Sequence, residues 1–184
     1  MTRPAVPDDA DSFSDLTLAQ LLDEISARTP APASGSAAGV AVALGAALCA
    51  MAARFSGRSL DGAEAMAETA ERLRARVLHL AQEDARAYAA VMAARRLPAE
   101  ASRQEALAAA MARAVAIPLE IAEIGGEIGR MATLVASEGN TNLLGDALSA
   151  VLIAEAGASA AATIAEINLA ESRAEGDSDG CRRG

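Results

Sequence analysis

The stretch TPAPASGSAAGVAVALGAALCAMAA, Thr29 to Ala53, has no charged residue and almost no large side chain. It opens with two prolines and a loop of small residues, and then continues as a run rich in alanine. Alanine is the best helix former and a poor strand residue. Because small side chains let neighbouring backbones approach closely, the stretch predicts a core helix from about Ser36 to Phe55 in an all-α protein.

The same stretch is also long enough to cross a bilayer, because the gap from Arg28 to Arg54 exceeds the roughly 20 residues that a span requires. Its bulky apolar residues are few, however, and Leu, Ile, Phe and Val are the residues that drive insertion. Pro30 and Pro32 also shorten the helix at its start. We therefore expect a core helix whose entrance borders a pocket, and no membrane span.

The composition narrows the class of protein further. A chain of 184 residues fits one domain, and apolar residues make up 52% of it while aromatics make up only 2%, so aliphatic side chains must fill the core. The net charge of −9 argues against nucleic-acid binding. The two cysteines and the single histidine, His79, lack metal-ligand spacing, so we expect no metal site. The N-terminus lacks a signal pattern, and we expect a cytoplasmic protein.

The hydrophobic periodicity predicts a bundle of five helices over residues 15–172, with disordered segments at 1–14 and 173–184. The first helix begins at a capping box formed by Thr17 and Gln20. The third spans about 61–96, and the fourth begins near Ser102 and is kinked at Pro118. The fifth follows the EGNTN turn and runs to about Ala170. The apolar stripe of the first helix is Leu18, Leu21, Leu22 and Ile25.

Two carboxylates fall on apolar stripes of these helices. Asp84 lies at the centre of the stripe of the third helix, and Asp146 lies on the inward line of the fifth. A buried carboxylate without a partner costs several kcal/mol, so both require partners. For each carboxylate two explanations remain: it accepts hydrogen bonds within the core, or it belongs to a ligand site. The small-residue turn before Ser36 exposes backbone N–H groups at the positive end of a helix dipole. Arg95, on the stripe of Asp84, is placed to pair with another helix.

Several motifs in order resemble the cyclodeaminase/cyclohydrolase family. The opening LTLAQLLDEISARTPAPASGSAAGVAVALGAAL is similar to the family's first helices, whose loop reads PAPGGGS. EDARAYAAVMAARRLP resembles EDAxAFxxVMxAYxLP, and AVAIPLEIAE resembles xxVPLxxAE. EGNTNLLGDALSAVLIAEAG resembles xGNxNxxSDAGVAAxxAxAA, and the family's closing IN pair is matched by Ile167 and Asn168. The resemblance covers about residues 15–170.

The resemblance implies an all-helical homodimer that acts on a one-carbon-substituted tetrahydrofolate and needs no metal or redox cofactor. Members hydrolyse 5,10-methenyltetrahydrofolate to 10-formyltetrahydrofolate, or cyclise 5-formiminotetrahydrofolate with loss of ammonia. Because no formiminotransferase domain is present in the sequence, we expect the stand-alone cyclohydrolase type. The small side chains of the second helix lead us to expect a dimer interface through it.

The resemblance also assigns site residues. Asp146 is expected nearest the reacting carbon, and Asp84 is expected to orient substrate or water, the two facing one shared cavity. A desolvated carboxylate would attract the cationic methenyl group and take a proton from water. Arg95 and Arg96 are expected to hold the glutamate tail of folate, or else to close a helix as a surface pair. The remaining substrate-binding residues on this interpretation are Pro32, Gly35, Ser36, Tyr88 and Asn140.

The chain departs from the family pattern in its loop, where Ala33 and Ser34 replace two glycines. Each replacement adds a Cβ atom where substrate would approach. Gly145 also replaces the serine before the aspartate. An alternative is therefore a catalytically inactive helical dimer that serves as a binding or assembly module.

Overall fold

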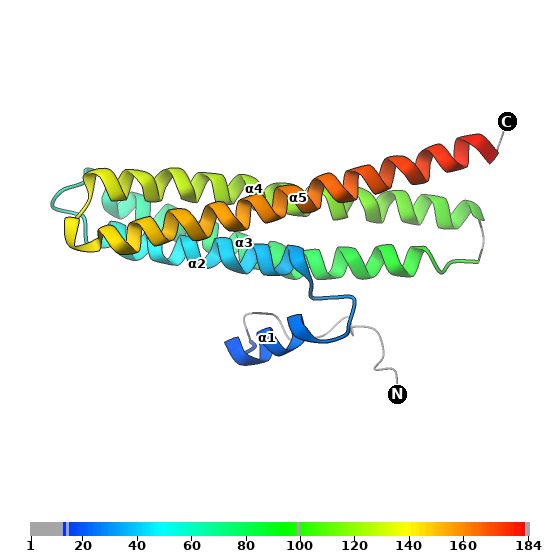
Figure 1. Ribbon diagram of the computed structural model, residues 1–184, viewed down its shortest axis with the longest axis horizontal. Coiled ribbons are helices and arrows are strands. Elements are labelled where there is room, and N and C mark those ends of the chain that lie inside the picture. Colours follow the sequence, from blue (N-terminus) through cyan, green and yellow to red (C-terminus); the bar gives the residue numbers. More distant parts are fainter. Residues whose placement is uncertain (1–12, 14, 99, 183–184) are drawn as a thin grey trace.

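The chain folds into an antiparallel body of four long helices with a short helix beside it (Figure 1). The computed structural model describes residue 13 and residues 15–98 and 100–182. Its helices are α1 (Leu18–Ser26), α2 (Ser34–Arg54), α3 (Ala63–Ala94), α4 (Glu100–Glu138) and α5 (Leu144–Arg182), with a 3₁₀ turn, η1, at Thr141–Leu143. None of the described residues forms a strand. The predicted all-α bundle of five helices is thus confirmed.

The core lies among α2, α3, α4 and α5 and consists almost entirely of small aliphatic side chains. Its largest fully buried apolar residues include Leu80, Ile121, Ile128, Val42 and Val77, and none of them is aromatic. Cys49 is buried among them as a free thiol, and this burial raises its pKa to about 11. Small side chains on all four helices therefore set the short distances between the helix axes.

Helices α2, α4 and α5 pack closely around Val42 of α2. A Cβ atom at Gly125 of α4 would lie 2.8 Å from the Cβ atom of Ala158 and 3.0 Å from Cγ2 of Val42. A Cβ atom at Gly157 of α5 would lie 2.8 Å from the same Cγ2. The valine side chain occupies the space that these two glycines leave. Gly125 therefore weakens the local helix propensity of α4 but makes this close approach possible.

Helix α4 continues through Pro118, and α5 satisfies the backbone group that the proline leaves unpaired. Proline has no N–H, so the carbonyl oxygen of Ala114, four residues earlier, loses its helical donor. The side-chain Nδ2 of Asn168 on α5 donates to that oxygen at 2.7 Å. Pro118 is fully buried. Two motifs that lie far apart in the sequence thus form one packing unit.

The two turns at one end of the bundle are tied together by Ser56 and Asn140. The hydroxyl of Ser56, which follows α2, accepts a hydrogen bond from the backbone N–H of Asn140 at 2.9 Å. The side-chain Nδ2 of Asn140 donates to the carbonyl oxygen of Phe55, and its Oδ1 accepts from the N–H of Asn142. The predicted N-cap in the EGNTN turn is confirmed. The connection between α4 and α5 is thereby fixed against that between α2 and α3.

Helix α1 agrees with the prediction at its start but not in its packing. The Thr17–Gln20 capping box is present. However, Leu18 and Leu22 are exposed and only Leu21 of the predicted stripe is buried. The helix has nine residues and lies beside the four-helix body, not within it (Figure 1). Most of its surface therefore stays exposed. The preceding segment is held to α3 by a hydrogen bond from the N–H of Phe13 to Oε1 of Gln82.

Two other boundaries differ from the prediction. Helix α4 begins at Glu100, so Ser102 lies within its first turn and does not cap it. Helix α5 runs on to Arg182, past the expected end near Ala170. Its extension carries Glu171 and Glu175, which pair with Arg95 of α3 at 2.5 and 2.9 Å. The predicted disordered segment 1–14 falls mostly outside the described residues.

Among the residues that the structure describes, two helices have the length and hydropathy of a membrane span. The most apolar 18-residue stretch of Ser34–Arg54 is 61% buried inside the molecule, whereas that of Thr141–Glu175 is only 28% buried. A core helix of a soluble protein passes the same test, so this finding is weak evidence for a membrane. The burial of α2 agrees with the prediction of a core helix. The exposure of α5 leaves an apolar face whose role is considered below.

Candidate functional site

Asp84 meets the N-terminus of α2. Ser36 supplies a backbone hydrogen bond to its carboxyl group, and the Ser36 hydroxyl lies 3.5 Å from Oδ2. A Cβ atom built on Gly35 would overlap this carboxyl group. The predicted proximity of Asp84, Gly35 and Ser36 is therefore present in the structure.

The start of α2 explains why the carboxylate lies there. The first N–H groups of a helix lack partners within the helix, and a side chain of the N-cap residue usually accepts from them. The N-cap of α2 is Ala33, which forms no side-chain cap. Asp84 of α3 supplies the missing acceptor from another element. The sequence contains no signal for this arrangement, because PASGS contains Ser34, a common N-cap residue, and only the structure shows that Ala33 takes the N-cap position.

Burial raises the pKa of the Asp84 carboxyl group. Desolvation is the largest cause, and the two hydrogen bonds from Ser36 oppose it by favouring the charged form. No charged neighbour among the described residues contributes to the shift. A carboxylate with a raised pKa is closer to the range in which general acid–base catalysis works at neutral pH. Perturbed groups of this kind are concentrated at functional sites.

Tyr88 and Pro32 are two further residues that we predicted to bind substrate. Tyr88 follows Asp84 by four residues on α3 and therefore shares its face of the helix. It is 41% exposed, so its ring is accessible to a ligand. Pro32 is half-buried and joined to the buried Ala31 by a cis peptide bond. The structure therefore gathers Asp84, Gly35 and Ser36, with Tyr88 one turn further along α3.

Asp146 lies near the opposite end of α2 from Asp84. Gly35 of α2 faces Asp84, whereas Gly45, ten residues later, faces Ala150 and Ala154 of α5. Helices α2 and α5 are antiparallel, so Asp146 lies one further turn away from Gly35. At 1.5 Å per residue the two carboxylates are more than about 20 Å apart along the bundle. The expected shared cavity is therefore not formed within one chain.

Asn140 and Arg95 use their polar groups in other contacts. Asn140 ties the two turns at the Asp146 end, as described above, and so has a structural role there. Arg95 pairs with Glu171 and Glu175 of α5, which fulfils the expectation of a partner on another helix. Arg96 is exposed at the end of α3. In the structure these residues do not surround Asp84.

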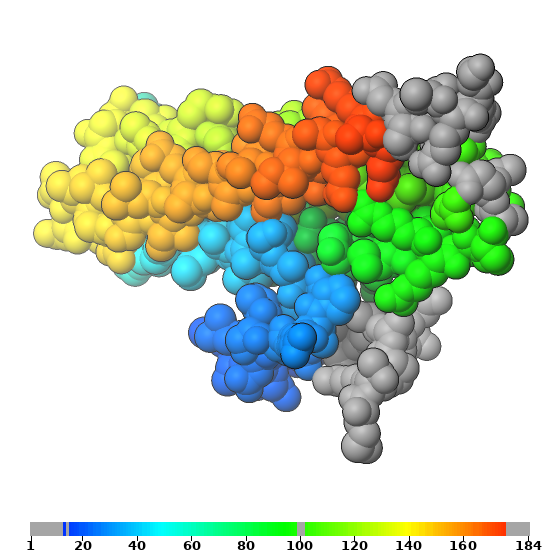
Figure 2. Space-filling view, turned by 45° about the vertical axis from the view of Figure 1, so that its right-hand side comes forward, coloured from blue at the N-terminus to red at the C-terminus, as the bar shows by residue number. Residues whose placement is uncertain are grey.

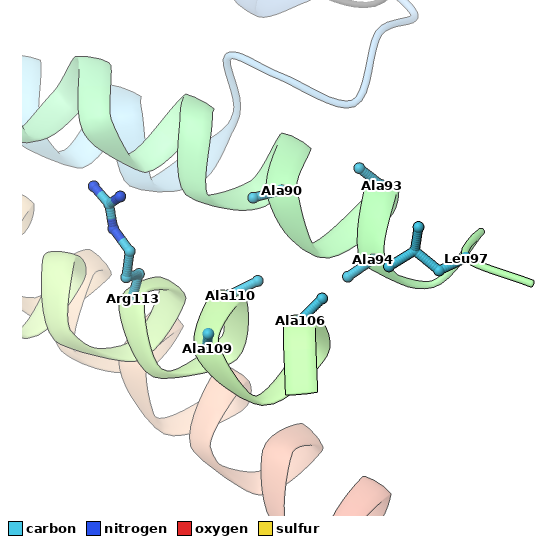
Figure 3. Close-up of a pocket in the computed structure, with 8 residues that line it drawn as sticks. All are labelled: Ala90, Ala93, Ala94, Leu97, Ala106, Ala109, Ala110 and Arg113. Carbon is cyan, nitrogen blue, oxygen red and sulfur yellow. The ribbon is translucent and has the colours of Figure 1, made fainter. Parts of the chain in front are cut away.

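An apolar groove lies between the end of α3 and the start of α4 (Figure 3). It has a volume of about 410 Å³ and is open to solvent. Arg113 is its only charged lining residue, and its guanidinium donates to Oε1 of Glu83 at 3.3 Å. None of the predicted site residues lines it, and it contains no acid. The groove therefore lacks the groups that the predicted chemistry requires. Its lining is Ala90, Ala93, Ala94, Leu97, Ala106, Ala109, Ala110 and Arg113.

The histidine belongs to a surface cluster of charged side chains around Glu83. Nε2 of His79 lies 3.8 Å from Glu83, one turn along α3, and the histidine is exposed as predicted. Glu83 also faces Arg76 and Arg113. Across the described part of the chain, no three His, Cys, Asp or Glu side chains are grouped to hold a metal ion.

Known proteins resemble this chain along most of its length. The sequence pattern of the formiminotransferase-cyclodeaminase family matches residues 17–179. Methenyltetrahydrofolate cyclohydrolase of Methylorubrum extorquens is 32% identical over 163 residues, which cover 83% of this chain and 78% of that protein. Formimidoyltransferase-cyclodeaminase of Rattus norvegicus is also 32% identical, and its match covers 89% of this chain but 33% of the rat protein.

A solved structure shows the same fold. The crystal structure of formiminotetrahydrofolate cyclodeaminase from Thermotoga maritima superposes with a TM-score of 0.77 at 27% identity. The match covers 86% of this chain and 80% of that one. The family pattern, the sequence identity and the shared fold all span the region from α1 to α5. The chain therefore belongs to the formiminotransferase-cyclodeaminase family.

Proposed function

We propose that this protein is a folate one-carbon enzyme in which Asp84 is a catalytic carboxylate. The observation that carries the proposal is the desolvated Asp84 side chain at the N-terminus of α2, in a chain of this family. The methenyl group of the substrate is a cationic amidinium. A carboxylate in a partly desolvated position attracts such a cation more strongly than it would in water.

In the proposed reaction Asp84 acts as a general base. Water attacks the carbon between N5 and N10, and Asp84 accepts a proton from that water. The protonated Asp84 then gives this proton to N5 as the carbon–N5 bond breaks, and the hydroxyl on the tetrahedral carbon loses its proton to water as the formyl C=O forms. The products are 10-formyltetrahydrofolate and one proton. No oxidation state changes, so the proposal includes no redox cofactor, and it includes no metal. General-base catalysis of this kind contributes about 10²- to 10⁴-fold to the rate.

Of the two reactions, we favour hydrolysis of 5,10-methenyltetrahydrofolate. The match to the cyclohydrolase of Methylorubrum extorquens covers most of both chains, whereas the rat cyclodeaminase is matched over a third of its length. We place the enzyme in the cytoplasm, where a reducing compartment suits the free thiol of Cys49.

The test is the loss of methenyltetrahydrofolate absorbance with purified protein. We expect hydrolysis well above the buffer rate, and a loss of about 10²-fold or more in Asp84→Asn. Ammonia release from 5-formiminotetrahydrofolate, measured in parallel, identifies a cyclodeaminase. A wild-type protein no faster than buffer in both assays refutes the enzyme. If it still binds the folate, it is a binding module.

We also propose that the enzyme is a homodimer formed through the outer face of α2 and α5. Figure 2 shows these two helices side by side on one face. Leu44 of α2 is 54% exposed, and Leu148 and Leu152 of α5 are 48% and 67% exposed. Exposed leucines on adjoining helices are typical of a surface that a partner covers. This proposal keeps the interface that we expected through the second helix.

An antiparallel dimer of this kind would explain the separation of Asp84 and Asp146. A two-fold axis perpendicular to the helices and passing near the middle of α2 would bring the Asp146 region of one copy towards the start of α2, and hence Asp84, of the other. The proposed site then takes one carboxylate from each subunit. Mixing inactive Asp84→Asn with inactive Asp146→Asn tests this. Subunit exchange should restore up to about a quarter of the activity for a random mixture with two sites per dimer, whereas sites within single chains give no recovery. Light scattering that finds only monomer refutes the dimer.

A further inference from the structure

The contacts around Asp84 assign a role to the two small residues that face it. Gly35 has no Cβ, and the carboxyl group of Asp84 occupies the place where one would stand. Any larger residue here would push the carboxylate away from the backbone N–H groups of α2. The glycine is therefore required by the acid itself, before any substrate is considered.

Ser36 connects the same two helices by its side chain. It is fully buried, and its hydroxyl donates to the carbonyl oxygen of Ala81 at 2.9 Å. Ala81 lies one turn before Asp84 on α3. The hydroxyl has one proton, so the longer contact of 3.5 Å to Oδ2 of Asp84 is secondary to the contact with Ala81. The side chain thus fixes the start of α2 against α3, and its backbone N–H is then directed at the carboxyl group.

We propose that Ser36 is a positioning residue for the Asp84 carboxylate and that Gly35 provides the space for it, so that both residues serve the acid and neither forms a backbone cradle for the substrate. The inference deepens the proposed function and rests on it for its catalytic part. The positional part concerns only the carboxylate and can be tested without any enzyme activity.

The electrostatic surroundings make the effect of Ser36 measurable. Helix α2 carries one charged residue, Arg54, and that lies at its far end. On α3 the neighbouring Glu83 is engaged by Arg76 and Arg113 and not by the start of α2. The groups that shift the pKa of Asp84 are its buried surroundings and the two donors of Ser36. A change at Ser36 should therefore appear directly in the titration of Asp84.

Ser36→Ala, with Ser56→Ala as matched control, tests the proposal. Both serines are fully buried, and each donates to a backbone carbonyl, of Ala81 at 2.9 Å and of Ala52 at 2.8 Å. Loss of the Ser36 hydroxyl removes the bond that holds the start of α2 to Ala81, so the backbone N–H of Ser36 is directed less well at the charged carboxylate and the pKa of Asp84 should rise by about half a unit. The Ser56 change should leave that pKa unmoved. Ser36→Thr, which keeps a hydroxyl, should return the pKa towards that of the wild type.

Two readouts separate this inference from the proposed function. Carbon-13 NMR of the carboxyl groups follows the titration of Asp84 even in an inactive protein. A pKa that stays the same in Ser36→Ala, or shifts equally in Ser56→Ala, overturns the positioning role. In an active enzyme the acid limb of the kcat/KM profile should move to higher pH by the same amount, because the ionised base is required. If the pKa of Asp84 shifts in the NMR titration but the acid limb of the kcat/KM profile does not, the catalytic role of Asp84 is contradicted and the positioning role of Ser36 is not.

Gly35→Ala distinguishes space for the acid from contact with the substrate. If the glycine serves Asp84, kcat should fall by about 10-fold or more while KM changes little, because the base is displaced. If the loop instead binds the ground-state substrate, KM should rise with kcat unchanged, and this result contradicts the proposal. If the variant does not fold, the NMR titration of Ser36→Ala still decides.

Discussion

Replacing Asn168 by alanine should destabilise the fold because of a proline on another helix. Nδ2 of Asn168 donates to the carbonyl oxygen of Ala114 at 2.7 Å, the oxygen that Pro118 leaves without a helical donor. The alanine side chain cannot donate, so a largely buried acceptor would lose its partner. The cost is that of leaving this oxygen unsatisfied.

The magnitude follows from the burial of the two groups. An unsatisfied buried acceptor costs about 1–3 kcal/mol. Ala114 is buried but Asn168 is only half-buried, so some water can reach the oxygen after the change. We therefore expect the lower part of that range, about 1–1.5 kcal/mol. For a chain of this length the melting temperature should fall by about 3–5 °C.

A double-mutant cycle with Pro118→Ala isolates the interaction. Alanine at position 118 restores an N–H that can donate to the Ala114 oxygen, so Asn168 should no longer be needed. Urea unfolding followed by far-UV circular dichroism should then show a cost of Asn168→Ala below about 0.5 kcal/mol in the Pro118→Ala background. The cavity left by the proline ring is common to both arms and cancels. An equal cost of Asn168→Ala in both backgrounds would refute the reasoning.

Three further predictions concern residues with an assigned environment. Because burial raises the pKa of Asp84, its ionised form costs folding stability as pH rises through that pKa. Asp84→Asn should therefore be more stable than wild type at about pH 8 and lose this advantage near about pH 4, and a difference that is constant with pH in urea unfolding would exclude it. Arg95→Ala should cost under about 1 kcal/mol in urea unfolding, because its ion pairs with α5 are partly exposed, and should leave KM unchanged. An increase in KM would instead indicate that Arg95 contacts the glutamate tail of folate. Asn140→Ala should lower stability by about 1–2 kcal/mol in thermal unfolding, through lost hydrogen bonds between the turns, and an unchanged melting temperature with a raised KM would favour a substrate contact.

The sequence was sufficient for the fold because its signals are local. The Thr17–Gln20 capping box, the apolar run of α2 and the Asn140 turn each specify structure within a few residues. The end of α5 was harder to predict, because its polar residues resemble a solvated tail. Its extension carries Glu171 and Glu175, whose partner Arg95 lies on α3 and is invisible to a local pattern.

The candidate site could be predicted only in part for a similar reason. A helical stripe shows that Asp84 turns inward, but not that it meets the start of α2. Asp146, which the periodicity of α5 predicts on its inward line, is half-buried in the structure. Periodicity gives the direction of a side chain around its helix and not the level at which two helices face each other. That level is set by contacts such as Gly45 against Ala154, which no single segment encodes.

In this alanine-rich core, substitutions that add volume should be more destabilising than those that remove it. In a core of large side chains, truncation leaves cavities and is the costly change. Here most buried side chains are a single methyl group, so there is little volume to remove. Added volume has no space to enter, because the helices already touch around Val42, Gly125 and Gly157. Sequence drift in this protein should therefore be restricted mainly by the upper size of each buried residue, with bulk admitted only at the helix ends and on the outer faces.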